Sequence, residues 1–304
     1  MSETGAGLRQ PGTWISFALC SLIWGSTWLV ITGQLGAVPP TWSVAYRFLI
    51  GASVMFVYAR LAVGSVRLDR EGHLFAVLYG VPQFCFQFNA VYFAEQYVTS
   101  GLVAVIYALL LVPNALFAWL LLKHRISGRF LLGSIVAIAG VGLLLLPELR
   151  AHPGSIGALM HGMAFALFGI VSASAANIIQ ATDRIRIHSL PPMIAWGMLY
   201  GSVANVAIAL SAYGPPILDF RLTYWAGLAY LGIVASALVF SLYFPLVRII
   251  GPGKAAYIGL ITPIIAMLLS SFFENYQWTL AAGFGGLLVL VGLFIALRSG
   301  RNPS

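Results

Sequence analysis

The sequence predicts an all-α membrane protein in which ten transmembrane helices form two inverted five-helix repeats. Three observations lead to this prediction: the composition, the number of apolar segments of spanning length, and an internal similarity between the two halves. Of the 304 residues, 60% are hydrophobic and only 8% are charged, whereas soluble domains carry roughly 25% charged residues. A chain with so few charges cannot solvate its own surface in water, so most of it is expected to lie in lipid.

Apolar segments long enough to cross a bilayer follow one another along the whole chain. A hydrocarbon core of about 30 Å requires roughly 20 apolar residues in helical conformation. The first segment lacks a signal-peptide cleavage site and is followed by many similar ones, so we expect it to remain as the first span. The predicted spans are residues 13–33, 41–62, 73–94, 98–122, 129–147, 154–177, 190–212, 222–246, 252–273 and 279–297.

The basic residues predict how these spans are oriented. With the N-terminus in the cytoplasm, thirteen of the sixteen Lys and Arg residues fall in inner connectors, whereas the outer connectors hold only Arg150 and Arg221. This asymmetry follows the positive-inside rule and predicts a bacterial inner (plasma) membrane protein with both termini cytoplasmic. It also explains the net charge of +8 without a nucleic-acid partner. The inner residues are Arg9, Arg60, Arg67, Arg70, Lys123, Arg125, Arg129, Arg184, Arg186, Arg248, Lys254, Arg298 and Arg301.

An internal repeat relates the two halves, which we place at residues 1–150 and 151–304. Each half holds five predicted spans, so the second half must enter the membrane in the opposite orientation. Inverted repeats are typical of transporters, because the halves can exchange conformations and open a central site to either side in turn. A duplication kept only for packing is the alternative. A shift of 150 residues places Gly101 on Gly251, Tyr107 on Tyr257, Pro113 on Pro263, Gly133 on Gly283, and Val141-Gly142-Leu143 on Val291-Gly292-Leu293.

Several stretches resemble the drug/metabolite transporter superfamily, in its ten-helix EamA-type branch. The similarity rests on "SLIWGSTWLV" (21–30), "AYRFLIGA" (45–52), "SGLVAVIYALLLVPNALFAWLLL" (100–122), "LLGSIVAIAGVGLLLL" (131–146) and "AAGFGGLLVLVGLFIAL" (281–297). The resemblance implies a carrier, often an exporter, of amino acids or other small metabolites. Members typically carry an acid after the fourth and ninth helices. Glu274 is similar to the second of these acids, but His124 stands where the first would be.

Polar and aromatic residues at mid-membrane depth are candidates for a solute site. Gln83 and Gln87 are four residues apart and therefore share one helix face. A buried amide requires partners or water, so this face is expected to line a cavity, although hydrogen bonding between helices without a solute is the alternative. Trp24 lies near the centre of the first span, where it either walls a cavity or packs.

The fourth and ninth spans carry matching features. Tyr107 and Asn114 are seven residues apart and are expected to share a helix face, with Pro113 between them. Tyr257 and Pro263 repeat this arrangement. Proline inside a span removes a backbone hydrogen bond, which favours a bend or a hinge. The paired prolines therefore suit two symmetric gates, with simple kinks as the alternative.

Ionisable residues inside the predicted spans are few. Arg47 lies about six residues from the outer start of its span, roughly 9 Å deep at 1.5 Å per residue. This depth favours a structural or gating role, in which Arg47 contacts helix carbonyls or pairs with Glu95, over a role as the solute's anchor, which stays open. His161 lies at a comparable depth and is able to titrate. No carboxylate lies at mid-depth, so exchange or facilitated transport fits as well as proton coupling.

The sequence therefore predicts a secondary transporter of a small solute in a lipid bilayer, with no cofactor or metal. A lipid-modifying membrane enzyme is the first alternative, but no catalytic motif is present; a channel is the second. The fifth and tenth spans hold many glycines and are expected to pack on the bundle or to form a homodimer. The predicted substrate-binding residues are Trp24, Gln83, Gln87, Tyr107, Asn114, His161 and Tyr257, and the predicted gating or structural residues are Arg47, Glu95, Pro113 and Pro263.

Overall fold

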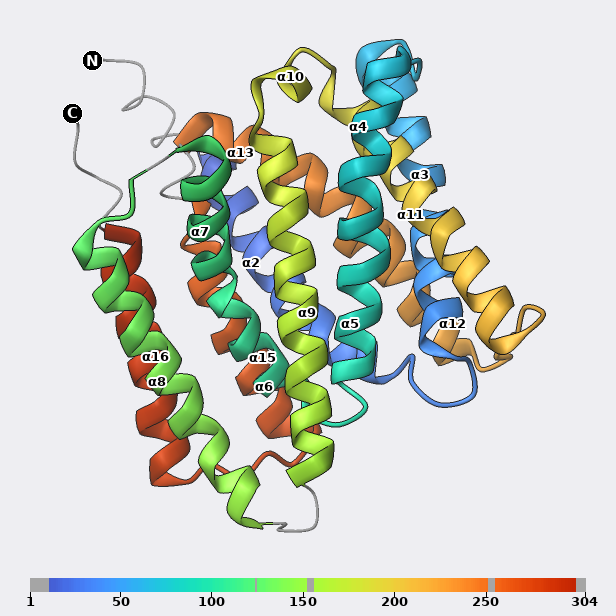
Figure 1. The fold of residues 1–304 in the computed structure, drawn as a ribbon. Coiled ribbons are helices and arrows are strands. Elements are labelled where there is room, and N and C mark those ends of the chain that lie inside the picture. The colour runs from blue at the N-terminus through green and yellow to red at the C-terminus, as the bar shows by residue number, and fades with distance from the viewer. Residues whose placement is uncertain (1–10, 124, 152–155, 251–254, 299–304) are drawn as a thin grey trace. The chain divides into compact units, whose positions relative to one another are not determined.

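The computed structural model describes residues 11–123, 125–151, 156–250 and 255–298 (Figure 1). All regular secondary structure in these ranges is helical, which confirms the all-α prediction. Arg9, Lys254 and Arg301, which contributed to the predicted orientation, lie outside the described residues, as does His124.

Nine helical stretches in the described ranges are long and apolar enough to cross a membrane. A tenth helix, α15, is shorter, with 16 residues. Of the predicted span 252–273, residues 252–254 lie outside the described residues, and Tyr257 lies in a turn directly before α15. The helices of the first half are α2 (Pro11–Thr32), α3 (Pro40–Val63), α4 (Arg70–Val81), η1 (Pro82–Phe86), α5 (Gln87–Ala94), α6 (Ser100–Tyr107), η2 (Ala108–Leu110), α7 (Leu111–Leu122) and α8 (Gly128–Ala151). Those of the second half are α9 (Ile156–Ala181), α10 (Asp183–Arg186), α11 (Leu190–Tyr213), α12 (Leu222–Ala229), η4 (Tyr230–Leu238), α13 (Val239–Ile250), α15 (Ile258–Phe273) and α16 (Leu280–Arg298).

The helices group into two compact units, and each unit takes segments from both halves of the sequence. Unit 1 comprises residues 1–29, 97–164 and 239–304. Unit 2 comprises residues 30–96 and 165–238. Equivalent helices of the two repeats therefore meet inside one unit, as α8 and α16 do in unit 1 and α3 and α11 do in unit 2.

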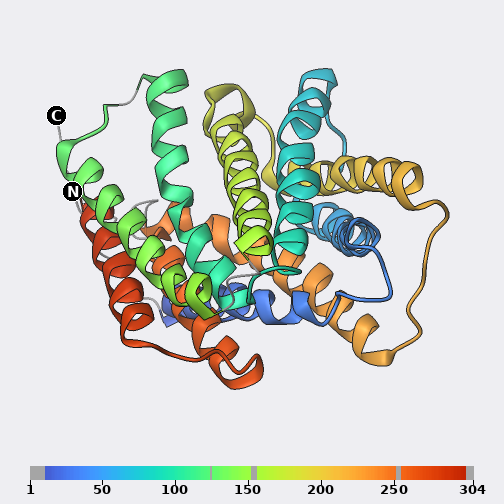
Figure 2. The same cartoon turned by 60° about the horizontal axis from the view of Figure 1, so that its bottom comes forward.

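In unit 1, α8 and α16 are antiparallel and in close backbone contact (Figure 1 and Figure 2). Gly133 lies against Gly292, and Gly140 lies against Gly285, so the residue order reverses between the two helices. A Cβ added at Gly140 would lie 2.6 Å from the Val289 amide nitrogen. Only glycine permits this approach, which is how membrane helices commonly gain packing contacts.

In unit 2, α3 and α11 are also antiparallel. Ser202 donates a hydrogen bond from Oγ to the carbonyl oxygen of Ala45 (2.8 Å), and further along α3 the Phe56 ring lies 5.1 Å from that of Trp196. The order of the partners therefore reverses here as well. Because equivalent helices are antiparallel in both units, the repeats are inverted, as predicted.

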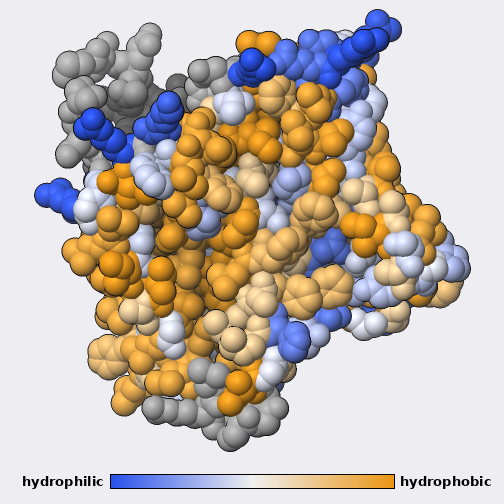
Figure 3. All heavy atoms as spheres, in the orientation of Figure 1, coloured by the Kyte–Doolittle hydropathy of each residue, from blue (hydrophilic) through white to orange (hydrophobic). Residues whose placement is uncertain are grey.

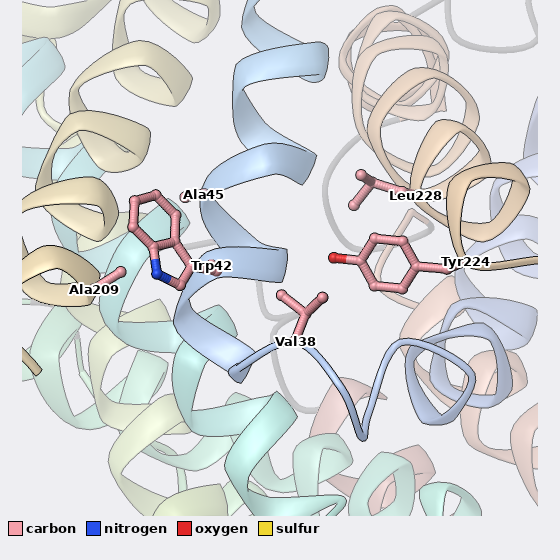
Figure 4. Packing of buried hydrophobic residues seen from close by; sticks show 6 residues of the cluster. All are labelled: Val38, Trp42, Ala45, Ala209, Tyr224 and Leu228. Carbon is pink, nitrogen blue, oxygen red and sulfur yellow. The ribbon is translucent and has the colours of Figure 1, made fainter. Parts of the chain in front are cut away.

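One end of α3 packs into a buried hydrophobic cluster with α11 and α12 (Figure 4). The Tyr224 hydroxyl points towards α3, where it makes a 2.8 Å hydrogen bond with Ser43 Oγ. Burial of a tyrosine with its hydroxyl satisfied gains the apolar area of the ring without losing a hydrogen bond. The cluster consists of Val38, Trp42, Ala45, Ala209, Tyr224 and Leu228.

Backbone geometry repeats along with the helices. Gly64 and Gly214, which follow the equivalent helices α3 and α11, have φ of 75° and 77° and are 150 residues apart. Lys123 and Asn275 follow α7 and α15 with φ of 57° and 56°, and they are 152 residues apart. Positive φ is uncommon outside glycine, so this second match supports a duplication. Pro113 and Pro263 are 150 residues apart but Lys123 and Asn275 are 152 apart, so the second repeat has two additional residues between Pro263 and Asn275.

The surface is suited to lipid. Apolar side chains cover most of the face seen in Figure 3, and hydrophilic ones gather where α3 ends and α4 begins. Arg60, Arg67 and Arg70 belong to that end and are exposed. The connector before α12 is held by Asp219, which accepts hydrogen bonds from the backbone and side chain of Arg221. These hydrogen bonds hold the pKa of the Asp219 carboxyl below its ordinary value.

Glu274 has a structural position in unit 1. Its carboxylate accepts hydrogen bonds from the backbone N–H and the hydroxyl of Ser100, the first residue of α6. The N-cap residue Thr99 makes no side-chain capping bond, so Glu274 supplies this interaction from another helix. A carboxylate at a helix N-terminus is favourable for both hydrogen bonding and the helix dipole.

We expect Glu274→Gln to lower the free energy of unfolding by about 1 kcal/mol, because the amide loses the charge that α6 favours. Thermal unfolding of the purified chain in detergent measures the change. Glu71→Gln is the control, since Glu71 is exposed in the first turn of α4. Equal losses for the two variants would show that Glu274 contributes only a solvent-exposed charge.

Candidate functional site

The third span of each repeat is interrupted by a π-helix at the equivalent place. η1 covers Pro82–Phe86, and η4 covers Tyr230–Leu238, which includes the residues 150 positions further on. Pro82 has no N–H, so the regular i to i−4 ladder cannot continue through it. The Gln87 N–H bonds to the Pro82 carbonyl instead, five residues back. π-helices are rare and frequently lie at functional sites.

Amide side chains surround η1 in unit 2. Gln83 donates to Gln87 (Nε2 to Oε1, 2.6 Å), so the predicted pair faces each other. Asn89 Nδ2 donates to Asn205 Oδ1 (2.5 Å), and Asn205 Nδ2 donates to the Phe84 carbonyl within η1 (3.0 Å). Asn205 thereby joins α11 to the π-helical backbone. Asn205 is fully buried, and a buried amide is stable only when it is hydrogen-bonded.

We expect Asn205→Leu to lower the free energy of unfolding by about 2 kcal/mol, because Asn89 and the Phe84 carbonyl lose a buried partner. A double-mutant cycle with Asn89→Leu tests the contact. The pair should show an interaction energy of about 1 kcal/mol in thermal or denaturant unfolding. Additive losses would show that the two side chains are not coupled.

Arg47 lies in the interior of unit 2 with only 2% of its surface exposed. Its guanidinium carbon is 4.3 Å from the centre of the Phe88 ring and 5.2 Å from that of Phe48. Nε and Nη2 each donate to Ser236 Oγ in η4 at 3.4 Å, which is long for such bonds. Desolvated cation–π contacts are worth about 2 kcal/mol, so the rings offset only part of the cost of burying the charge.

Two polar residues of α5 and its end lie near the same guanidinium. Tyr92 and Glu95 both interact electrostatically with Arg47. The Tyr92 hydroxyl makes no hydrogen bond of normal geometry with any described residue, and neither does Arg47 Nη1. Glu95 is 7% exposed. The pairing of Arg47 with Glu95 and their role in gating both stay predictions.

Aromatic residues group around two predicted positions in unit 1. The Trp24 ring lies 5.0 Å from Tyr243 and 5.7 Å from Phe240, both in α13. The Tyr107 ring lies 5.1 Å from Trp28. These side chains pack on each other, so their contacts fit both the cavity-wall role and the packing role predicted for Trp24.

The helix breaks near the two tyrosines are equivalent. α6 ends at Tyr107 and is followed by the 3₁₀ segment η2, whereas Tyr257 lies in the turn before α15. Pro113 is the third residue of α7, and Pro263 lies inside α15. Because η2 separates Tyr107 from Asn114, the continuous helix assumed for their shared face is absent.

His161 lies near the start of α9 and is exposed. Its ring stacks on Tyr97 at 5.8 Å, and Nδ1 contacts the Gly157 carbonyl one turn earlier (2.6 Å). Both contacts belong to unit 1. The predicted substrate-binding residues therefore divide: Gln83 and Gln87 lie in unit 2, whereas Trp24, Tyr107, Asn114, His161 and Tyr257 lie in unit 1.

The sequence reasoning missed several neighbours of the predicted residues. Ser236, Phe88 and Tyr92 surround Arg47, and Asn205 anchors η1. A serine or phenylalanine in an apolar span carries no special sequence signal. Asn205 had one, since an amide inside a predicted span requires a partner.

The inverted repeats, the broken helices and the buried polar groups together define a polytopic integral membrane protein with the architecture of a carrier. The chain belongs to the EamA-like transporter family, whose profile matches residues 12–146 and again residues 156–298. It is thus a membrane transporter and not an enzyme, as predicted.

Two of the relatives described next are named transporters, and a solved structure shares the fold. "Protein PagO" of Salmonella typhimurium (strain LT2) is 25% identical and covers 97% of this chain and 96% of the relative. The uncharacterized transporter YvbV of Bacillus subtilis (strain 168) is 23% identical, with 94% and 92% covered. The uncharacterized inner membrane transporter YicL of Salmonella typhimurium is 28% identical over 63% of each chain. A protein crystal structure with 19% identity has a TM-score of 0.68, covers 97% of this chain and 100% of its own, and shares the fold.

Proposed function

We propose that the protein is a secondary transporter that exports small metabolites such as amino acids by alternating access. One observation carries the proposal: the interruptions of the helices come in equivalent pairs. The π-helices η1 and η4 form one pair, and the breaks at Tyr107 and Tyr257 form the other. Each repeat therefore has helix interruptions at the same places in opposite orientation, which suits an exchange of conformations between the repeats.

The residue roles follow from this proposal. The proposed solute-binding residues are Trp24, Gln83, Gln87, Tyr107, Asn114, His161 and Tyr257. Pro113 and Pro263 would act at symmetric gates, since both lie in the helices that break. Arg47 and Glu95 would act at the outer gate. The repeats would correspond to residues 1–150 and 151–304.

Counterflow in proteoliposomes tests the transport mechanism. Vesicles preloaded with an unlabelled solute should take up the labelled solute faster than empty vesicles, and the uptake should saturate. A thermal-shift screen against amino acids, sugars and nucleosides selects the solutes, because a bound solute stabilises the folded state by mass action. Linear flux without acceleration by internal solute would favour a channel instead.

The proposed location is the bacterial inner membrane with both termini cytoplasmic. The support is the predicted distribution of basic residues, together with the exposed arginines at the end of α3 and the start of α4. Single cysteines introduced at Arg67 and at Tyr213 should react with an impermeant thiol reagent from opposite sides of the membrane. Reaction of Arg67→Cys from the outside would reverse the proposed orientation.

A further inference from the structure

We infer that the Arg47 guanidinium binds the carboxylate of the transported solute, and that the Tyr92 hydroxyl assists it. This inference rests on the proposed transport function and names its substrate class, a solute with a single carboxylate. It adds a binding part to the gating role proposed for Arg47.

The hydrogen-bonding capacity of the Arg47 guanidinium is only partly used. Arginine presents five N–H donors in a planar fork. At Arg47, Nε and Nη2 both donate to the same acceptor, Ser236 Oγ, which is distant in the sequence. Nη1 has no described partner although the side chain is 98% buried. A purely structural arginine at this depth would gain most from full pairing, because an unsatisfied buried donor is costly.

The groups around the Arg47 guanidinium suit a carboxylate. The Tyr92 hydroxyl is fully buried and lies near the Arg47 guanidinium, with which it interacts both electrostatically and as a hydrogen-bonding side chain, but it makes no hydrogen bond of normal geometry to the described residues. A guanidinium and a hydroxyl are both donors to a carboxylate, and the guanidinium fork matches a carboxylate's two oxygens. The faces of Phe48 and Phe88 hold the guanidinium from the apolar side.

The element that holds the serine also contacts the backbone of Arg47. Ser236 belongs to η4, the π-helix whose equivalent in the first repeat is η1. Gly232 of η4 approaches α3 so closely that an added Cβ would lie 2.9 Å from the Arg47 carbonyl oxygen. A change in η4 would therefore act directly on the backbone and on the side chain of Arg47, which links occupancy of the site to helix rearrangement.

Glu95 sets the charge preference. Its carboxylate lies within electrostatic range and offsets part of the charge of Arg47. A monocarboxylate bound beside Arg47 and Glu95 gives the buried group a net charge of one negative unit. A dicarboxylate gives it two. We expect monocarboxylates to bind better than dicarboxylates of similar size.

The test compares carboxylates with their primary amides on the full chain in detergent and in proteoliposomes. The probes are isovalerate and isovaleramide, L-leucine and L-leucinamide, the other proteinogenic amino acids with their amides, and glutarate. At least one carboxylate should bind about 10-fold or more tightly than its amide, as expected for a charge-assisted hydrogen bond. Arg47→Gln should abolish this preference, whereas Arg67→Gln, which removes an exposed arginine of the same unit, should leave it unchanged.

Two conservative variants cover the case in which Arg47→Gln does not fold. Tyr92→Phe and Ser236→Ala should each weaken carboxylate binding about fivefold and leave amide binding unchanged. The inference is overturned if no carboxylate is preferred over its amide, or if these variants keep the preference. Counterflow with neutral amides, sugars or nucleosides would then still support the transporter. Absence of counterflow with every solute would overturn the proposed function itself.

Discussion

Arg47→Ala should lose folding or transport, whereas Arg47→Lys should keep part of both. Removal of one member of a buried charged pair costs about 3–5 kcal/mol, because the partner is left buried and uncompensated. We expect Glu95, which is 7% exposed and interacts electrostatically with Arg47, to be that partner. Lysine keeps the charge but not the planar contact with the Phe88 ring, so its loss should be smaller.

The double variant Arg47→Ala/Glu95→Gln identifies the cause. If the uncompensated carboxylate is responsible, Glu95→Gln should restore part of the folded yield that Arg47→Ala loses. The yield is measured by size-exclusion chromatography in detergent and the stability by thermal unfolding. A stable Arg47→Ala variant that transports normally would contradict both the structural and the binding roles of this residue.

Much of the fold was predictable because the bilayer imposes one simple requirement. A chain that crosses the hydrocarbon core must satisfy its backbone hydrogen bonds internally, so long apolar runs become helices. The predicted 41–62 and 190–212 correspond to α3 (Pro40–Val63) and α11 (Leu190–Tyr213) with little error. The ninth predicted span contains a turn at Tyr257 within an otherwise apolar run, and hydropathy does not register such a break.

The candidate site was less predictable because its contacts join helices that are distant in sequence. Arg47 and Ser236 are 189 positions apart, and Asn89 and Asn205 are 116 apart. Depth in the membrane identified Arg47 as unusual, but it carried no information on which ring or hydroxyl would face it. The π-helix at η1 depends on where the ladder re-forms after Pro82, and packing against α11 decides this.

In α8 and α16, the fifth and tenth helices, the repeat was predicted correctly but its 150-residue shift pairs the wrong glycines. The match at 150 residues pairs Gly133 with Gly283, although an added Cβ at Gly283 would meet no atom within 4 Å. Gly133 contacts Gly292, and Gly140 contacts Gly285. Because the repeat relates one contact to the other, Gly133 is equivalent to Gly285 and Gly140 to Gly292, and the members of each equivalent pair are 152 residues apart. The same shift relates the first residues of α8 and α16, Gly128 and Leu280.

Alanine substitutions at these glycines should therefore separate into two classes. Gly140→Ala should destabilise the protein by about 2 kcal/mol, because its Cβ would meet α16 backbone atoms 2.6 and 2.7 Å away and the helices would have to move apart. Gly142→Ala, two residues along the same helix, meets nothing within 4 Å and should be neutral or stabilising by up to about 1 kcal/mol through helix propensity.

The inverted repeat makes a second, independent prediction from the same geometry. Gly285→Ala should behave like Gly140→Ala, since its Cβ would lie 2.5 Å from the Leu144 amide nitrogen, and Gly283→Ala should behave like Gly142→Ala. Thermal unfolding of the four single variants in one detergent measures all of these differences. Destabilisation by Gly283→Ala but not by Gly285→Ala would favour the 150-residue register over the 152-residue one. Equal behaviour of all four would mean that α8 and α16 are not in close contact, and would leave their glycines free to pack on a second copy of the chain.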